Sequence, residues 1–262
     1  MTVRRWYSCS NSLEVGRGGV ALVVGAGPGI GSAVVHKCVN EGMTVCAVRR
    51  NGDKLKPLLD EIAVENVGKC HGFACDARKE DQVKSMVENI ERDLGPIELL
   101  VHNIGANIGY VPVAKTTSRQ YMKLWEMTAF SAFLVARETS QHMKPRGWGT
   151  ILFTGATASV RGSAGFSAFS GACMAKRALA QSLARELGPA GIHVAHVVVD
   201  GVVDNPNTRD YFGMTEEWER MSAVDGLLRP EDIADNMWNV HMQRRRSAWT
   251  HELDLRPWNE KW

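Results

Sequence analysis

The stretch VALVVGAGPGIGSAVVHK, residues 20–37, decides the fold of this chain. Five apolar residues, Val20–Val24, have the length of a buried strand and run directly into GAGPGIG, residues 25–31. Apolar residues at helical spacing follow, so the glycines stand between a strand and a helix. Glycines at such a junction permit a tight turn and let backbone N–H groups approach a pyrophosphate. The stretch therefore predicts a dinucleotide-binding unit, with a merely flexible glycine turn as the alternative.

Short apolar runs alternate with helical periodicity along the rest of the chain. Strands that are apolar on both faces and alternate with helices are typical of a parallel sheet covered on two sides. The sequence predicts one doubly wound α/β domain over residues 17–262, with about seven strands and helices on both faces, after an N-terminal extension at residues 1–16. Expected strands include Val20–Val24, Thr44–Val48, Ile97–His102, Thr150–Thr154 and Val194–Val199, and expected helices include Ser118–Met143, Ala168–Leu187 and Pro230–Val240.

Composition narrows the class of protein. The 262 residues carry 31 Lys and Arg against 29 Asp and Glu, a net charge of +2. This balance provides no basic field, so nucleic acid and membrane surfaces are excluded as default partners. The six cysteines form no CxxC pair and match no zinc spacing, so we expect no metal. Arg4 and Arg5 give the extension a weak likeness to an organelle transit segment. We expect a cytoplasmic protein, with a mitochondrial one as the alternative.

The glycine spacing is also that of a known family. Gly25, Gly29 and Gly31 fit the G-x-x-x-G-I-G pattern of the short-chain dehydrogenase/reductase superfamily, and the chain resembles that family over about residues 18–256. The resemblance implies a Rossmann fold and an oxidoreductase that uses a nicotinamide dinucleotide and a small-molecule substrate. It also implies a homodimer or homotetramer.

The end of the second expected strand indicates which dinucleotide to expect. A ribose 2′-OH is usually bound there by an acidic side chain, whereas a 2′-phosphate needs cations. Here Arg49 and Arg50 follow the strand, and two guanidiniums can hold a phosphate by bidentate bonds. This predicts NADP(H), with solvated arginines that only end the strand as the alternative. Together with the contacts that the resemblance implies, the expected cofactor-binding residues are Gly25, Gly27, Gly29, Ile30, Gly31, Arg49, Arg50, Asp76, Asn103 and Gly105.

The same resemblance points to a catalytic set that this chain lacks. In the family, a tyrosine transfers the proton, a lysine four residues later lowers its pKa, a serine orients the carbonyl, and an asparagine holds a water relay. The aligned positions here are Phe169, Cys173, Ala156 and Thr128. A phenyl ring has no proton to give, and general acid–base help is typically worth about 10²–10⁴-fold. The usual mechanism is therefore excluded.

Four other side chains are weak candidates for a substitute catalytic role. Lys176 shares a helix face with Cys173, and its side chain is expected to lean back toward the vacant lysine position. Ser159 and Arg161 follow the fifth expected strand, where such sheets bind substrates, and Asp200 is expected beside the nicotinamide pocket. Plainer interpretations stand beside these, among them a solvated Lys176 and an Asp200 that caps a loop.

Two hypotheses of function follow. The first is an NADP(H)-dependent oxidoreductase with a non-standard active site, which works without the tyrosine on acceptors such as conjugated enones or quinones. The second is a catalytically inactive dinucleotide-binding protein that acts as a sensor or as a partner subunit. The retained glycine turn fits both hypotheses, so the sequence leaves open whether the chain is an enzyme.

Overall fold

Seven parallel strands form one sheet in the part of the chain that the computed structural model describes, residues 19–65, 68–105, 109–212 and 216–261. The predicted extension at residues 1–16 lies outside this part. In space the strand order is β3-β2-β1-β4-β5-β6-β7. The strands are β1 (Val20–Val24), β2 (Thr44–Arg49), β3 (Lys69–Ala74), β4 (Ile97–His102), β5 (Gly149–Thr154), β6 (Ile192–Val199) and β7 (Glu252–Leu255).

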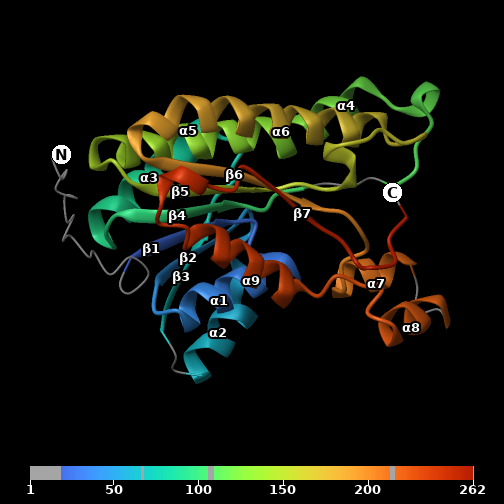
Figure 1. The fold of residues 1–262 in the computed structure, drawn as a ribbon, viewed down its shortest axis with the longest axis horizontal. Helices are drawn as coiled ribbons and strands as arrows, with labels where there is room; N and C mark the ends of the chain where they lie inside the picture. Colours follow the sequence, from blue (N-terminus) through green and yellow to red (C-terminus); the bar gives the residue numbers. More distant parts are fainter. Residues whose placement is uncertain (1–18, 66–67, 106–108, 213–215, 262) are drawn as a thin grey trace, which may run out of the picture.

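Helices cover both faces of the sheet, which confirms the predicted doubly wound α/β class (Figure 1). One face is covered by α1, α2 and α9, and the other by α3, α5 and α6. The helices are α1 (Ile30–Asn40), α2 (Lys56–Glu65), α3 (Glu80–Asp93), α4 (Ser118–Trp125), α5 (Ser131–Arg146), α6 (Ser167–Leu187), α7 (Pro206–Phe212), α8 (Glu216–Ala223) and α9 (Pro230–His241). None of the described helices has the length and apolar character that a membrane span requires.

Strand β1 shows why these apolar runs become central strands. All five of its residues are buried. Successive side chains point to opposite faces of the sheet, and helices cover both faces. Ala21 and Val23 belong to the apolar cluster beneath α1 and α9, whereas Leu22 and Val24 belong to the cluster beneath α3 and α5. A strand covered on both faces needs a continuous apolar sequence, and β1 has one.

The helix predicted over Ser118–Met143 is interrupted, and this part of the prediction is wrong. α4 ends at Trp125, a π-helical segment occupies Glu126–Phe130, and α5 continues from there. The π-helical segment carries i→i+5 hydrogen bonds, and such segments occur frequently at functional sites. It buries Thr128 completely and contributes Met127 to the wall of the cavity described below.

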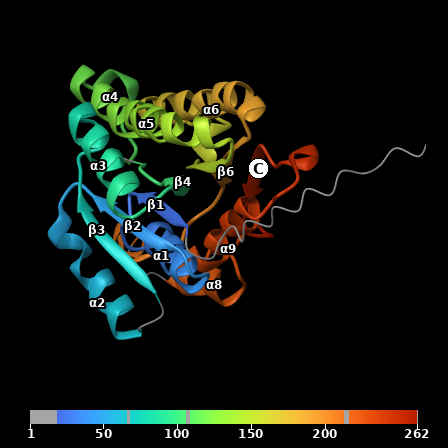
Figure 2. The same cartoon turned by 90° about the vertical axis from the view of Figure 1, so that its left-hand side faces the viewer.

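The strand order places a functional site at one edge of the sheet. β1 lies between β2 and β4, so the chain leaves β1 toward one side of the sheet and crosses to the other side before β4. Ligands of open α/β sheets bind outside the carboxyl ends of the strands at such a switch point. In both views α1 lies below this central part of the sheet (Figures 1 and 2).

Candidate functional site

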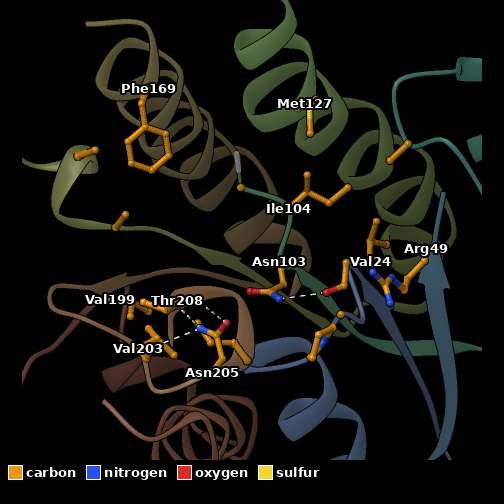
Figure 3. A pocket seen from close by; sticks show the side chains of 18 of the residues that line it. Val24, Arg49, Asn103, Ile104, Met127, Phe169, Val199, Val203, Asn205 and Thr208 are labelled. Carbon is orange, nitrogen blue, oxygen red and sulfur yellow. Dashed lines mark hydrogen bonds between the residues drawn. The ribbon is translucent and has the colours of Figure 1, made fainter. Parts of the chain in front are cut away.

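A cavity of about 900 Å³ lies at the carboxyl ends of the strands. Its wall is built from the segments that follow β1 to β6, together with residues of α6 and α7 (Figure 3). The sheet therefore brings together side chains that are up to about 180 positions apart in the sequence, from Val24 to Thr208. No group of three His, Cys, Asp or Glu side chains that could hold a metal ion occurs among the described residues.

The glycine turn has the close backbone packing that its sequence predicts. Gly25 and Gly29 both have φ of 100°, a conformation that favours glycine. A Cβ on Gly31 would lie 2.2 Å from the carbonyl oxygen of Gly25, so a side chain there would open the turn. The N-terminus of α1 has no side-chain cap, which leaves N–H groups available for an anion. The turn and the helix together form a cradle of the size and polarity that a pyrophosphate needs.

Asn103 joins the segments after β1 and β4. Its Nδ2 donates to the Gly25 carbonyl at 3.1 Å, and its backbone N–H donates to Val24 at 2.8 Å. Ile104 and Gly105 continue the cavity wall from there. Of the ten residues predicted to bind the cofactor, all but Gly29 and Gly31 line the cavity directly. These two act through the backbone, since Gly29 immediately precedes α1 and Gly31 packs against the turn.

One end of the cavity is strongly basic. Arg49, the last residue of β2, lines it together with Arg50 and Lys54 from the segment that follows, and Arg49 donates to the Lys54 carbonyl at 2.9 Å. Arg78 lines the same end and binds Asp76 through two bonds, Nε–Oδ1 at 2.8 Å and Nη2–Oδ2 at 2.6 Å. The bond from Arg78 lowers the pKa of the Asp76 carboxyl, and the charge of Arg50 adds to this effect. The single carboxylate here is thus already bound by an arginine.

Arg78 could not be predicted from the sequence, and its neighbour Asp76 is the residue of this segment that we expected in the site. Arg78 enters the site because it lies two positions beyond Asp76 in the turn that leads to α3. Its own pKa is raised by the hydrogen bond to Asp76. A third arginine at this end increases its capacity to bind a dianion.

The other end of the cavity carries no charge on any described lining residue. Phe169 projects from α6 toward the cavity, and Ile104 and Met127 lie across from it (Figure 3). The remaining lining residues of this end are Asn103, Ala156, Thr157, Ala158, Ser163, Phe166, Ser170, Val199, Gly201, Val202, Val203, Asn205 and Thr208. These side chains offer a ligand their shape and neutral hydrogen-bonding groups only.

The four positions where the resemblance expects catalytic residues separate into two pairs. Phe169 and Ala156 line the cavity. Cys173 and Thr128 are buried and do not line it. Burial raises the pKa of the Cys173 thiol, although the nearby Lys176 opposes the rise. This thiol is therefore mainly protonated at neutral pH and is a poor nucleophile.

Lys176 does not line the cavity, and its charge acts on the neighbouring Cys173, the residue at the vacant lysine position. Lys176 is 2% exposed, and its Nζ donates to the Ile104 carbonyl at 3.0 Å, behind the cavity wall. Burial lowers the pKa of this ammonium to about 8, and Cys173 partly offsets the fall.

The remaining weak candidates are held by protein groups and do not line the cavity. Ser159 is fully buried, and its Oγ accepts the Ala156 N–H at 3.1 Å. Asp200 is 1% exposed and accepts the Thr157 hydroxyl at 2.5 Å. Arg161 approaches Asp200 at 3.5 Å on the outer side. Asp200 thus ties the segments after β5 and β6 together, as the alternative of a loop-capping aspartate predicts, and it lies behind the lining residues Val199, Gly201 and Thr157.

Asn205 and Thr208 are lining residues that the sequence did not reveal. The Asn205 Nδ2 donates to Thr208 Oγ1 at 2.6 Å and to the Val203 carbonyl at 3.2 Å (Figure 3). A Cβ on Gly29 would lie 2.9 Å from the Asn205 Cβ, so the start of α7 packs against the glycine turn. An Asn-Pro pair before a helix is a recognisable capping signal, but it does not indicate this contact.

Three comparisons, with family models, protein sequences and solved structures, agree with one another. The family model described as short chain dehydrogenase matches residues 19–214. A solved short-chain dehydrogenase from Rhodopseudomonas palustris is 38% identical, with a TM-score of 0.77 over 92% of this chain and 100% of that one. A short-chain dehydrogenase/reductase of Armillaria gallica is 28% identical over 235 residues, which is 85% of this chain and 88% of the relative.

A metagenomic short-chain oxidoreductase solved in complex with NADP has the same fold. Its TM-score is 0.77 at 23% identity, over 92% of this chain and 98% of that one. At this level of identity the likeness concerns the fold alone. The shared fold covers nearly the whole length of both chains.

Proposed function

This chain belongs to the short chain dehydrogenase family, and we propose that its cavity binds NADP(H) as the cofactor of an oxidoreductase with a non-standard active site. The glycine turn and α1 would hold the pyrophosphate. Arg49, Arg50 and Arg78 would hold the 2′-phosphate at the basic end. When bound, this cofactor supplies hydride chemistry.

The observation that carries the preference for NADP(H) is the basic end of the cavity. An NAD ribose needs a free carboxylate there to accept its 2′-OH. Asp76 is engaged by Arg78 on both oxygens, and the last residue of β2 and the residue after it are Arg49 and Arg50. The complex of the metagenomic relative with NADP adds support from a protein of the same fold.

Titration of protein fluorescence with NADPH and NADH tests the proposal. We expect NADPH to bind at least about tenfold more tightly, since charge-assisted hydrogen bonds contribute about 1.5–3 kcal/mol each. The double variant Arg49→Met, Arg50→Met is expected to lose most of this preference while its affinity for NADH stays nearly unchanged. Arg92→Met, on the exposed face of α3, is the matched control. Equal affinities of the unmodified protein for the two dinucleotides would refute the phosphate site.

The chemistry of the uncharged end restricts the activity. Phe169 and Ala156 occupy wall positions where the family has its tyrosine and serine, so this chain excludes water there but does not move a proton. If the triple variant Phe169→Tyr, Cys173→Lys, Ala156→Ser reduces a panel of ketones no faster than the unmodified protein, this account of the site is wrong.

A second candidate function is a catalytically inactive member of the family that binds NADP(H) as a sensor or as a partner subunit. The replacement of all four catalytic residues favours it. Retained NADPH binding without turnover of any acceptor would support this function over the first.

We also propose a homodimer or homotetramer, as is usual in the family. The outer face of α4 and α5 carries a ladder of rings, Trp125 on Phe130 at 5.8 Å and Phe130 on Phe133 at 6.3 Å. Trp125 and Phe133 remain 37% and 39% exposed, which suits contact with a second copy of the chain. Light scattering coupled to size-exclusion chromatography would measure the assembly, and a monomer at micromolar concentration would contradict it.

A further inference from the structure

We propose that the acceptor of this site is a planar quinone, reduced without any proton donor from the protein. The inference rests on the proposed binding of NADPH and names the class of substrate for the same cavity. It is carried by the contrast between the two ends of the cavity, one basic and one uncharged.

The uncharged end has a shape and polarity that suit a flat apolar ring. The Phe169 ring faces the cavity from α6, opposite Met127 and Ile104 (Figure 3). Phe166 is a second aromatic wall residue, and the ring of Tyr110 packs edge-on against it at 6.3 Å. Aromatic side chains bind planar rings through stacked or edge-to-face contacts. An acidic or strongly polar substrate would find no ionic partner among the described wall residues of this end.

The missing proton donor determines which oxidised group fits. A ketone that receives a hydride at its carbonyl carbon becomes an alkoxide, a strong base whose conjugate alcohol is about as weak an acid as water. A quinone that receives a hydride at one oxygen becomes a phenolate-like anion, whose conjugate phenol has a pKa of about 10, as in tyrosine. The second product is a far weaker base and needs no proton at the moment of transfer. Because Phe169 and Ala156 donate no proton, we expect this site to reduce quinones faster than ketones.

The proposed reaction balances without a protein acid. The quinone gains two electrons and one proton as a hydride from NADPH, which is oxidised to NADP⁺. A C–H bond of the dihydronicotinamide breaks and an O–H bond forms at one quinone oxygen, so the quinone becomes a hydroquinone monoanion. After release, this anion takes its second proton from water.

A matched pair of acceptors tests the inference. The quinone is 2,3-dimethyl-1,4-naphthoquinone, which has no open ring position for thiol addition, and the ketone of equal ring size is 1-tetralone. Under anaerobic conditions, with NADPH oxidation followed at 340 nm, we expect kcat/KM for the quinone to exceed that for the ketone by at least about 100-fold, the lower range of general acid–base help. Similar values for the two acceptors would overturn the inference.

Binding without turnover gives an independent readout. With NADP⁺ in place of NADPH, calorimetric titration measures the dissociation constant of the quinone alone. Phe169→Ala is expected to weaken quinone binding about tenfold or more, because it removes an aromatic contact and apolar surface. Unchanged quinone affinity in this variant would place the quinone elsewhere and overturn the inference.

Two tyrosine variants test whether a tyrosine of this chain supplies the proton. Tyr110 contacts the wall residue Phe166, and Tyr211 follows Thr208 by three positions in the chain. We expect Tyr110→Phe and Tyr211→Phe to retain quinone reduction within about twofold. A loss of 100-fold or more in either variant would identify a protein proton donor and refute the inference. Tight NADPH binding without quinone reduction refutes this inference alone, whereas failure to bind NADPH refutes the proposed function as well.

Discussion

Replacement of Lys176 by methionine is expected to change how the stability of the protein depends on pH. Lys176 is 2% exposed, and its ammonium donates a hydrogen bond to the Ile104 carbonyl. Burial lowers its pKa from 10.5 to about 8. Because methionine has a similar volume and no proton to lose, Lys176→Met isolates the contribution of this ionisation.

The sign follows from proton binding. The pKa of Lys176 is lower in the folded chain than in the unfolded chain, so the folded chain binds fewer protons between pH 8 and 10.5. The free energy of unfolding therefore rises with pH across this window, and the cost of the buried charge is fully present below pH 8. The gap of 10.5 − 8, about 2.5 pKa units, corresponds to about 3 kcal/mol in total. About 2 kcal/mol of this falls between pH 7 and 9.5.

Urea unfolding followed by circular dichroism, at one protein concentration and at several pH values from 7 to 9.5, measures the effect. We expect the wild type to gain about 2 kcal/mol relative to Lys176→Met over this range. Lys84→Met, at an exposed position on α3, is the control and is expected to show no such divergence. A difference between the wild type and Lys176→Met that stays constant from pH 7 to 9.5 would show that Lys176 is not a desolvated ammonium.

Three further substitutions test other parts of the structure. Gly31→Ala places a Cβ 2.2 Å from the Gly25 carbonyl oxygen, so the turn must open; fluorescence titration should show NADPH affinity reduced more than tenfold, and unchanged affinity would contradict the cradle. Hydrogen bonds from Arg177 lower the pKa of Glu252 in the folded chain. Its contribution to stability is therefore present above the pKa that Glu252 has in the unfolded chain, and it is lost as the pH falls. Thermal melts should therefore show the wild type losing more stability than Glu252→Gln between pH 6 and 4, and parallel losses would refute this. Ile90→Ala removes a fully buried side chain and should cost about 2–5 kcal/mol in urea unfolding, whereas a loss below about 1 kcal/mol would contradict its core position.

The central strands could be predicted from the sequence because their apolar runs are continuous. β1 and β6 are buried at every position, which leaves a clear signal. β3, with the sequence KCHGFA, has partly exposed residues throughout because it lies at the edge of the sheet, and its apolar pattern is weak. The π-helical segment at Glu126–Phe130 leaves the helical periodicity of α4 and α5 nearly intact, so periodicity alone predicted one uninterrupted helix.

The candidate site was predictable where it depends on short-range sequence. The glycine turn and Asn103 each follow a strand directly and Arg49 ends one, so the carboxyl end of that strand determines their place. The direction of Lys176 depends on the depth of α6 against β4, and the position of Asn205 depends on how α7 meets the glycine turn. Both depend on tertiary packing, about which helical spacing and local motifs carry no information.

The pairing of β6 with β7 has a consequence for aggregation. β6 is buried at every position, and β7, a strand of four residues more than 50 positions later in the chain, pairs with it from His196 to Val199. Until β7 pairs with β6, or after a protease removes β7, the edge of β6 presents unpaired N–H and C=O groups along a mainly apolar strand. Such an edge recruits strands from other chains. The chain is therefore most prone to aggregate while β7 is not paired with β6, and a nick near residue 250 that releases β7 would create the same hazard in the folded molecule.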